Sequence, residues 1–152
     1  MFSVTELIEI AIRIEKNGES YYREALAKAS DPPIESMLRF LADQEVKHVQ
    51  WFEQLKQNKN ISAEDGELAE ISGAILENLV ADQRFSLDEV DVSQLEGVQR
   101  LLAVAIEFEK DTVLFYQVLR SLIDDPDSLA GLDEIIAEEN RHIQILKDYS
   151  TD

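Results

Sequence analysis

The chain has 152 residues, the length of one ordinary domain, and carries 32 Asp and Glu against 14 Lys and Arg, a net charge of −18. That charge repels the phosphates of nucleic acids and of anionic membranes, and no apolar run is long enough to span a bilayer, so we expect neither as a partner. The absence of Cys excludes disulfides and thiolate metal sites. Because the first residues also lack the features of a signal peptide, we expect a cytoplasmic protein.

The first half of the chain predicts a helical hairpin over residues 3–58. Five Gly and three Pro among many Ala, Leu, Ile, Glu and Lys residues favour helix over strand throughout. The first helix is predicted over 3–29, where Ser3 and Glu6 form a capping-box pattern. The second is predicted over 34–58, after a Pro-Pro pair that separates it from the first.

Residues 59–92 separate the two halves of the chain, and this segment is too long for a tight turn between antiparallel neighbours. It is predicted to cross the bundle, with a short extra helix over about 67–83, where Leu and Ile recur at helical spacing. A second hairpin over 93–149 follows, with helices at 93–122 and 128–149. The chain is therefore predicted to be one all-α domain, an antiparallel four-helix bundle made of two hairpins and a long crossover.

The two halves are related by an internal repeat. An ungapped alignment at an offset of 94 residues matches polar residues that include both histidines of the chain, namely Glu15 with Glu109, Glu45 with Glu139, and His48 with His142. The two hairpins are therefore predicted to face each other about a pseudo-twofold axis.

The helical phase places all six of these residues within the apolar stripe of their helices. A lone Glu-x-x-His is common by chance, and a single buried His is more often hydrogen-bonded core than a ligand. Here, however, two such motifs are each preceded by an inward Glu 30 residues earlier. Four ionised carboxylates inside a bundle would repel one another and resist desolvation, and two divalent cations would cancel their charge.

The donor types narrow the choice of metal. Mixed oxygen and nitrogen donors suit iron or manganese, zinc would tolerate them, and calcium would not choose the imidazoles. We predict a two-metal centre, with two iron ions per chain as the first expectation, whose ligands are Glu15, Glu45, His48, Glu109, Glu139 and His142.

Other polar residues are weaker candidates. Glu19, one turn beyond the first predicted ligand, is a candidate extra ligand. Tyr22 and Tyr116 lie at a spacing that suits either a hydrogen bond to a ligand carboxylate or simple packing. Glu107 and Glu138 sit beside the inward positions and are predicted to face solvent.

The strings that carry the predicted ligands resemble the rubrerythrin branch of the ferritin-like superfamily over nearly the whole chain. They are Ala11-Ile12-Arg13-Ile14-Glu15-Lys16 with Tyr21-Tyr22, Glu45-Val46-Lys47-His48, Glu109-Lys110, and Glu139-Asn140-Arg141-His142. The resemblance implies a ferritin-like fold and a non-haem di-iron centre that reacts with peroxide or dioxygen. It also implies a homodimer or a larger homo-oligomer.

Two departures qualify the resemblance. Rubrerythrins add a Cys-ligated rubredoxin-like iron domain, which a chain without Cys cannot form, so electrons would come from a separate donor protein. They also carry a further glutamate one turn beyond the third-helix ligand, where this chain has Thr112. The expected function is a di-iron oxidoreductase. The alternative is an iron-binding protein that oxidises ferrous ion for storage or delivery.

Overall fold

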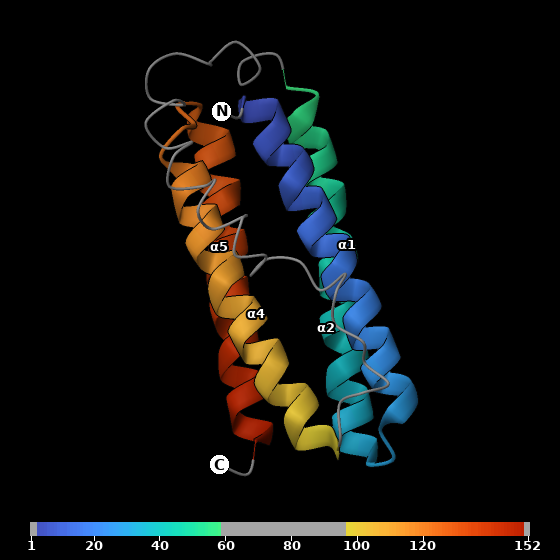
Figure 1. Cartoon of the computed structure of the whole chain (residues 1–152). Helices are drawn as coiled ribbons and strands as arrows, with labels where there is room; N and C mark the ends of the chain where they lie inside the picture. The colour runs from blue at the N-terminus through green and yellow to red at the C-terminus, as the bar shows by residue number, and fades with distance from the viewer. Residues whose placement is uncertain (1–2, 59–96, 151–152) are drawn as a thin grey trace.

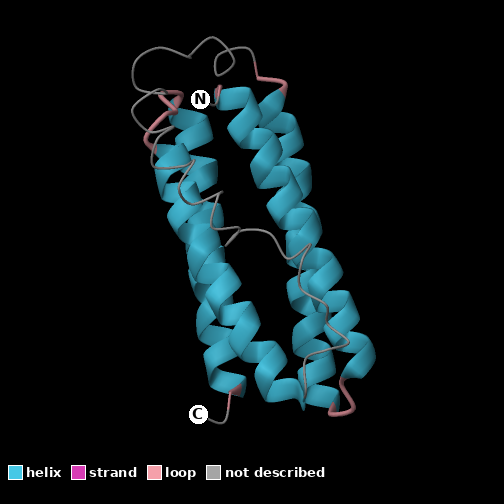
Figure 2. Ribbon diagram, in the orientation of Figure 1, coloured by secondary structure: helices cyan, strands magenta, loops and turns pink. Residues whose placement is uncertain are grey.

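The computed structural model describes residues 3–58 and 97–150, and every regular element within those ranges is an α-helix. The helices are α1 (Val4–Lys28), α2 (Pro32–Lys56), α4 (Gly97–Arg120) and α5 (Pro126–Tyr149). Figure 1 shows them as two antiparallel hairpins, α1 with α2 and α4 with α5, packed side by side. Figure 2 shows only short connections within each hairpin. The predicted all-α four-helix bundle is confirmed.

The second and last helices begin two residues earlier than predicted, because proline lies inside each helix and does not precede it. Pro32 follows the N-cap Asp31, and Pro126 follows the N-cap Asp125. Proline suits the first helical position, where its missing N–H would have no partner within the helix and its fixed φ is already helical. The Asp125 carboxylate also accepts from the backbone N–H of Ser128 at 3.1 Å.

The capping box predicted at the start of α1 is present. The Ser3 hydroxyl accepts from the backbone N–H of Glu6 at 3.1 Å, and the Glu6 carboxylate accepts from the backbone N–H of Ser3 at 2.9 Å. These two bonds satisfy N–H groups that have no partner in the helical ladder. The helix therefore starts at a defined residue.

The two hairpins start at opposite ends of the bundle. α2 ends at the same end of the bundle where α1 starts, whereas α4 starts at the opposite end (Figure 1). Across the hairpins, α1 packs against α4 and α2 against α5. The predicted crossover at 59–92, its short helix at 67–83 and the first residues of the helix predicted to start at 93 lie outside the described residues.

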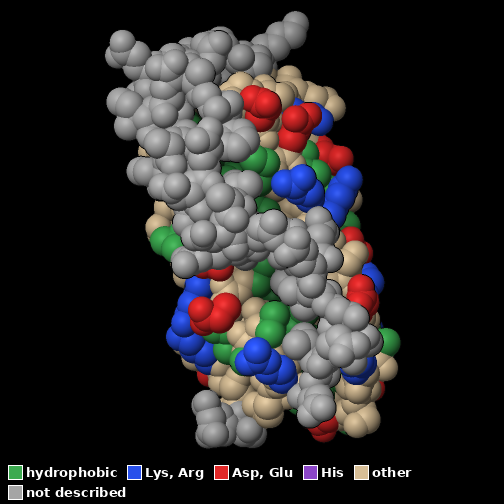
Figure 3. All heavy atoms as spheres, in the orientation of Figure 1, with side chains coloured by type: hydrophobic (Ala, Val, Ile, Leu, Met, Phe, Trp, Pro, Cys, Tyr) green, Lys and Arg blue, Asp and Glu red, His purple; other side chains and the backbone are tan. Residues whose placement is uncertain are grey.

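The core consists of two apolar clusters with a polar layer between them. One cluster includes Leu7, Phe52 and Leu119, and the other includes Leu41 and Leu102. On each helix the inward Glu lies between residues of the two clusters, so the polar layer crosses the bundle near its middle. The two histidines of this layer are buried, and none is visible among the coloured side chains in Figure 3. No helix in the described ranges is both long and apolar enough to cross a membrane.

Candidate metal centre

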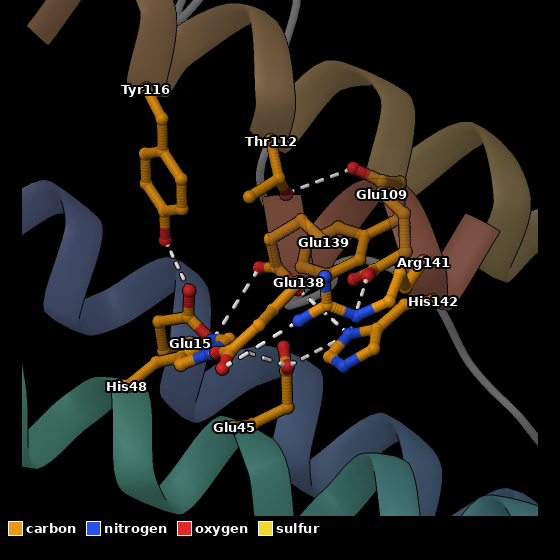
Figure 4. Close-up of polar contacts among 11 residues, drawn as sticks. Glu15, Glu45, His48, Glu109, Thr112, Tyr116, Glu138, Glu139, Arg141 and His142 are labelled. Carbon is orange, nitrogen blue, oxygen red and sulfur yellow. Dashed lines mark hydrogen bonds and ion pairs between the residues drawn. The ribbon is translucent and has the colours of Figure 1, made fainter. Parts of the chain in front are cut away.

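The polar layer is formed by the six residues that the sequence singles out. Each helix contributes one Glu to it, and α2 and α5 each add a His one turn after their Glu (Figure 4). All four Glu side chains have no exposed surface, and the two His side chains are at most 3% exposed. The structure thus brings together Glu15, Glu45, His48, Glu109, Glu139 and His142.

Around His48, the Nδ1 atom faces the carboxylates. It lies 3.3 Å from Oε1 of Glu15 and 3.8 Å from both Oε1 of Glu45 and Oε2 of Glu139. Three of these four residues come from the first hairpin and one comes from the second. One ligand atom from each of the four could contact a single ion, because these atoms all lie within 4.8 Å of one another.

The arrangement around His142 mirrors the first. Its Nδ1 atom lies 2.8 Å from Oε1 of Glu139, 3.2 Å from Oε2 of Glu109 and 3.7 Å from Oε1 of Glu45. These four residues form the second group whose ligand atoms lie within 4.8 Å of one another. The rings of His142 and His48 are nearly parallel, 18° apart, with their centroids at 6.0 Å. The pseudo-twofold relation of the repeat therefore extends to the side chains.

Glu45 and Glu139 belong to both groups and lie between the histidines. Within the described residues, five of the buried carboxylate oxygens have no hydrogen-bond partner: both oxygens of Glu45, both of Glu139, and Oε1 of Glu109. One of them, Oε1 of Glu139, is close to Nδ1 of His142 but is not aligned for a hydrogen bond. Buried carboxylate oxygens without partners are costly, so this donor set fits two divalent cations.

The protonation of the cluster without a cation shows the same need for positive charge. Burial, together with the neighbouring carboxylates, raises the pKa of Glu45 well above its ordinary value. Burial and the charge of Glu139 raise the pKa of Glu109 to about 8. For His48, burial lowers the pKa, but Glu15, Glu139 and Glu138 together outweigh this effect and the pKa rises to about 10. Protons therefore occupy the cluster when no cation does, and cation binding would release them.

Two buried tyrosines line the cluster in different ways. The Tyr116 hydroxyl donates to Oε2 of Glu15, which leaves Oε1 of that carboxylate facing His48. This is one of the two roles that the sequence left open for these residues. Within the described residues, the Tyr22 hydroxyl is buried with no hydrogen-bond partner. Burial and the charges of nearby carboxylates, that of Glu109 first, raise its pKa well above the ordinary value.

A glycine in the middle of α1 makes room for one of the shared carboxylates. A Cβ atom on Gly18 would lie 2.6 Å from Oε2 of Glu45, closer than a Cβ atom approaches any non-bonded atom. The repeat counterpart of Gly18 is Thr112, which is fully buried and donates its hydroxyl to the backbone carbonyl of Phe108 at 2.9 Å. The sequence places Gly18 in the core stripe, and the offset of 94 pairs it with Thr112, but neither pattern reveals that a side chain fits only at the second position.

The structure separates the weaker candidates. Oε2 of Glu19 lies 2.8 Å from Nε of Arg23 on the partly exposed side of α1, so the structure does not bring this residue into the cluster. Glu107 is exposed, as predicted, and lies 3.5 Å from Lys110.

The expectation for Glu138 is wrong, because it does not simply face solvent. Its Oε1 atom lies 2.7 Å from Nε2 of His48. Glu138 directly precedes the inward Glu139, so its side chain leaves α5 at the flank of the helix. In this bundle His48 of α2 lies at that flank. Sequence phase alone could not identify that neighbour, since it depends on how the two hairpins pack.

Comparisons with known proteins bear on the fold and the family of the chain. The crystal structure of a Thermotoga maritima protein, described as a ferritin-like diiron-carboxylate protein, is similar to this chain with a TM-score of 0.72 and 23% identity, over 97% of this chain and 93% of that one. At this identity the likeness establishes the fold alone. A search of curated proteins gave no match. The profile of the ferritin-like domain matches residues 3–151, and the chain therefore belongs to the ferritin-like domain family.

Proposed function

We propose that this chain is a non-haem di-iron protein that reduces peroxide or dioxygen with electrons from a separate donor protein. The observation that carries the proposal is the buried cluster itself, with its five unpartnered carboxylate oxygens and with the Nδ1 atoms of both histidines facing those of Glu45 and Glu139. Oxygen and nitrogen donors in this mixture suit iron, and manganese and zinc are the competing metals. Acidic residues that only keep a protein soluble would lie at the surface in contact with water, whereas these carboxylates are buried without partners.

The positions of the side chains suggest their roles. Glu45 and Glu139, which lie between the histidines, would bridge two ions. Glu15 and Glu109 would each hold one ion, and each histidine would bind one ion through Nδ1, the nitrogen that faces the carboxylates. All six residues of this ligand set come from one chain, so each subunit of an oligomer would carry a complete centre.

Two bound iron ions would supply a two-electron redox couple and a Lewis acid for the oxidant. The protein would supply orientation and exclusion of water. Tyr116 holds one oxygen of Glu15 and so directs the other toward the cluster. The apolar clusters on both sides of the polar layer lower the local dielectric, which strengthens each carboxylate's hold on a cation. Burial and the charges of nearby carboxylates raise the pKa of Tyr22 well above its ordinary value, so its hydroxyl would keep its proton and stay neutral beside the site.

The near twofold symmetry of the cluster supports a redox centre more than a storage site. Each half holds a His and access to the same two shared carboxylates, so the two ions would have closely similar donor sets. An iron-binding protein that oxidises ferrous ion for storage or delivery is the alternative. Native mass distinguishes the two: the redox enzyme is expected as a homodimer or small assembly with two irons per chain, and storage as a large shell with many.

The direct test is stopped-flow mixing of the ferrous-loaded protein with hydrogen peroxide, followed by iron absorbance. We expect oxidation much faster than that of free ferrous ion, with two irons oxidised per chain. Glu109→Gln removes one buried charge of the cluster and should bind less iron and abolish the fast phase. Glu107→Gln makes the same change on the exposed side of α4 and should behave as wild type.

Oxidation no faster than that of free ferrous ion would refute the redox proposal, even if two irons bind. A protein purified without added metal that holds fewer than about one metal per chain, and gains no stability when metal is added, would refute the metal centre as well, since a bound metal normally contributes several kcal/mol to folding.

A further inference from the structure

The two histidines differ at the nitrogen that points away from the cluster. Nε2 of His48 lies 2.7 Å from Oε1 of Glu138, on the neighbouring hairpin (Figure 4). A carboxylate can only accept, so the imidazole donates its Nε2 proton. A cation that displaces the proton on Nδ1 would then meet its lone pair among the carboxylates of the candidate centre. This hydrogen bond thus selects both the orientation and the tautomer of His48.

Glu138 has a second charged neighbour and is only partly buried. Its side chain is 25% exposed, and its second oxygen, Oε2, lies 3.9 Å from Nη2 of Arg141. Arg141 is on the next turn of α5 and is mostly exposed. Glu138 therefore connects the buried His48 to the surface without belonging to either group of ligand atoms.

The other half of the repeat lacks this carboxylate. At the offset of 94 residues, the counterpart of Glu138 is Gln44, which carries no charge. Beside His142 lies the ring of Phe40, at a centroid distance of 6.3 Å and nearly perpendicular, and the counterpart of Phe40 is the exposed Glu134. Within residues 3–58 and 97–150, no carboxylate pairs with Nε2 of His142. The inner donors are thus symmetric, whereas their surroundings are not.

We propose that Glu138 is a positioning residue that makes the two half-sites unequal, so that a divalent cation binds first and more tightly at the His48 half. A carboxylate that accepts from the outer nitrogen of a metal-binding histidine fixes its ring and raises its basicity, and loss of such a partner typically lowers metal affinity about 10- to 100-fold. In the first hairpin the matching position holds the uncharged Gln44, and the ring of Phe40 lies beside His142. The inference rests on the proposed metal centre but not on its reaction.

The test is a titration of the full chain with Zn²⁺, followed by nitrogen-15 NMR of the imidazoles. The chain has only two histidines, so each ring is observed separately. In the wild type we expect the first equivalent of Zn²⁺ to shift the signals of His48 and the second those of His142. A proton should remain on Nε2 of His48 throughout.

Three variants isolate the role of Glu138. Glu138→Ala should weaken binding at the His48 half about 10- to 100-fold, so that the His48 half no longer fills first, and should leave the His142 half near its wild-type affinity. Glu138→Gln keeps an acceptor oxygen and should retain the order of filling with a smaller difference. Glu134→Ala removes a carboxylate from the exposed side of α5, one turn earlier, and should match the wild type.

Wild-type binding at His142 first, an unchanged order in Glu138→Ala, or equal weakening of both halves would overturn this inference. Because Zn²⁺ is redox-inert, these outcomes are independent of any reaction with peroxide. Ordered Zn²⁺ loading without peroxide reduction would refute the proposed function alone. A wild-type chain that binds no Zn²⁺ would overturn the proposed metal centre together with this inference.

Discussion

Replacement of Gly18 by Ala should damage the candidate metal centre without damaging the fold. The added Cβ would lie 2.6 Å from Oε2 of Glu45 and 3.3 Å from a ring carbon of Phe108. Ordinary contact begins at 3.4 Å, so the carboxylate oxygen would have to retreat by about 0.8 Å. Metal sites tolerate errors of only about 0.2 Å in their ligand distances. A shared carboxylate displaced by several times that amount should no longer serve both half-sites.

The effect on stability should have the opposite sign. Gly in a helix interior is less favourable than Ala by about 1 kcal/mol, because its backbone loses more freedom on folding. The atom that must move is the tip of a flexible side chain, which can rotate at little cost. We therefore expect metal-free Gly18→Ala to be as stable as the wild type or more stable by up to about 1 kcal/mol. Its affinity for metal should fall about 10-fold or more.

Gly131 provides a matched control, because it is also a glycine inside a helix that closely faces a side chain. A Cβ there would lie 2.5 Å from Cζ2 of Trp51 and 2.7 Å from its Nε1, and a rigid indole cannot withdraw one atom at a time. Overpacking of this kind typically costs about 1–3 kcal/mol. Gly131→Ala should therefore lower stability and leave metal affinity unchanged.

Two measurements on each variant decide the question: denaturant unfolding of the metal-free protein, and titration with Co²⁺ followed by its visible absorption. The expected pattern is crossed, with Gly18→Ala defective only in binding and Gly131→Ala only in stability. Wild-type Co²⁺ affinity in Gly18→Ala would refute the reasoning, since it would mean that the Glu45 carboxylate is free to move without consequence for the site.

Two further predictions concern the metal-free protein. The pKa values of His48 and His142 rise to about 10 and about 9, against ordinary values of 6.5, because nearby carboxylates outweigh burial. Between pH 6.5 and 9 the folded chain thus holds more protons than the unfolded one, so the free energy of unfolding should fall as pH rises, by about 1.4 kcal/mol per pH unit for each extra proton. Thermal melts across this range should show that fall and a flatter profile once metal is bound; a rising profile would contradict the pKa shifts. Tyr116→Phe removes the donor to the buried Glu15 and should cost about 1.5–3 kcal/mol in denaturant unfolding, whereas Tyr22→Phe removes a hydroxyl without a partner and should cost much less. Equal losses in the two variants would contradict the assigned hydrogen bond.

The bundle and its central cluster could be predicted from the sequence because they depend on periodicity. A Glu in the apolar stripe of a helix must point inward, and a repeat that matches both histidines brings two such hairpins face to face. Helix starts were less well predicted, since Pro32 reads as a break although it occupies the first turn of α2. The capping box at Ser3 was predicted because its signal is local.

The surroundings of the cluster depend on packing between hairpins, which periodicity does not encode. Glu138 lies beside an inward residue and reads as solvent-facing, but the neighbouring hairpin places His48 against it. Gly18 reads as a small core residue, and its contact with Glu45 becomes visible only when α1 and α2 are docked. From its position one turn after Glu15, Glu19 is a candidate ligand, but in the structure it pairs with Arg23 instead.

Each half of the cluster draws on both hairpins. Glu139, from the second hairpin, contributes to the group around His48, and Glu45, from the first, contributes to the group around His142. The hairpins are separated in sequence by residues 59–96. Ions held in the cluster would therefore act as a reversible cross-link between distant parts of the chain. Like a disulfide that closes a long loop, such a link would exclude many conformations of the unfolded chain. It would hold the two hairpins together at mid-length.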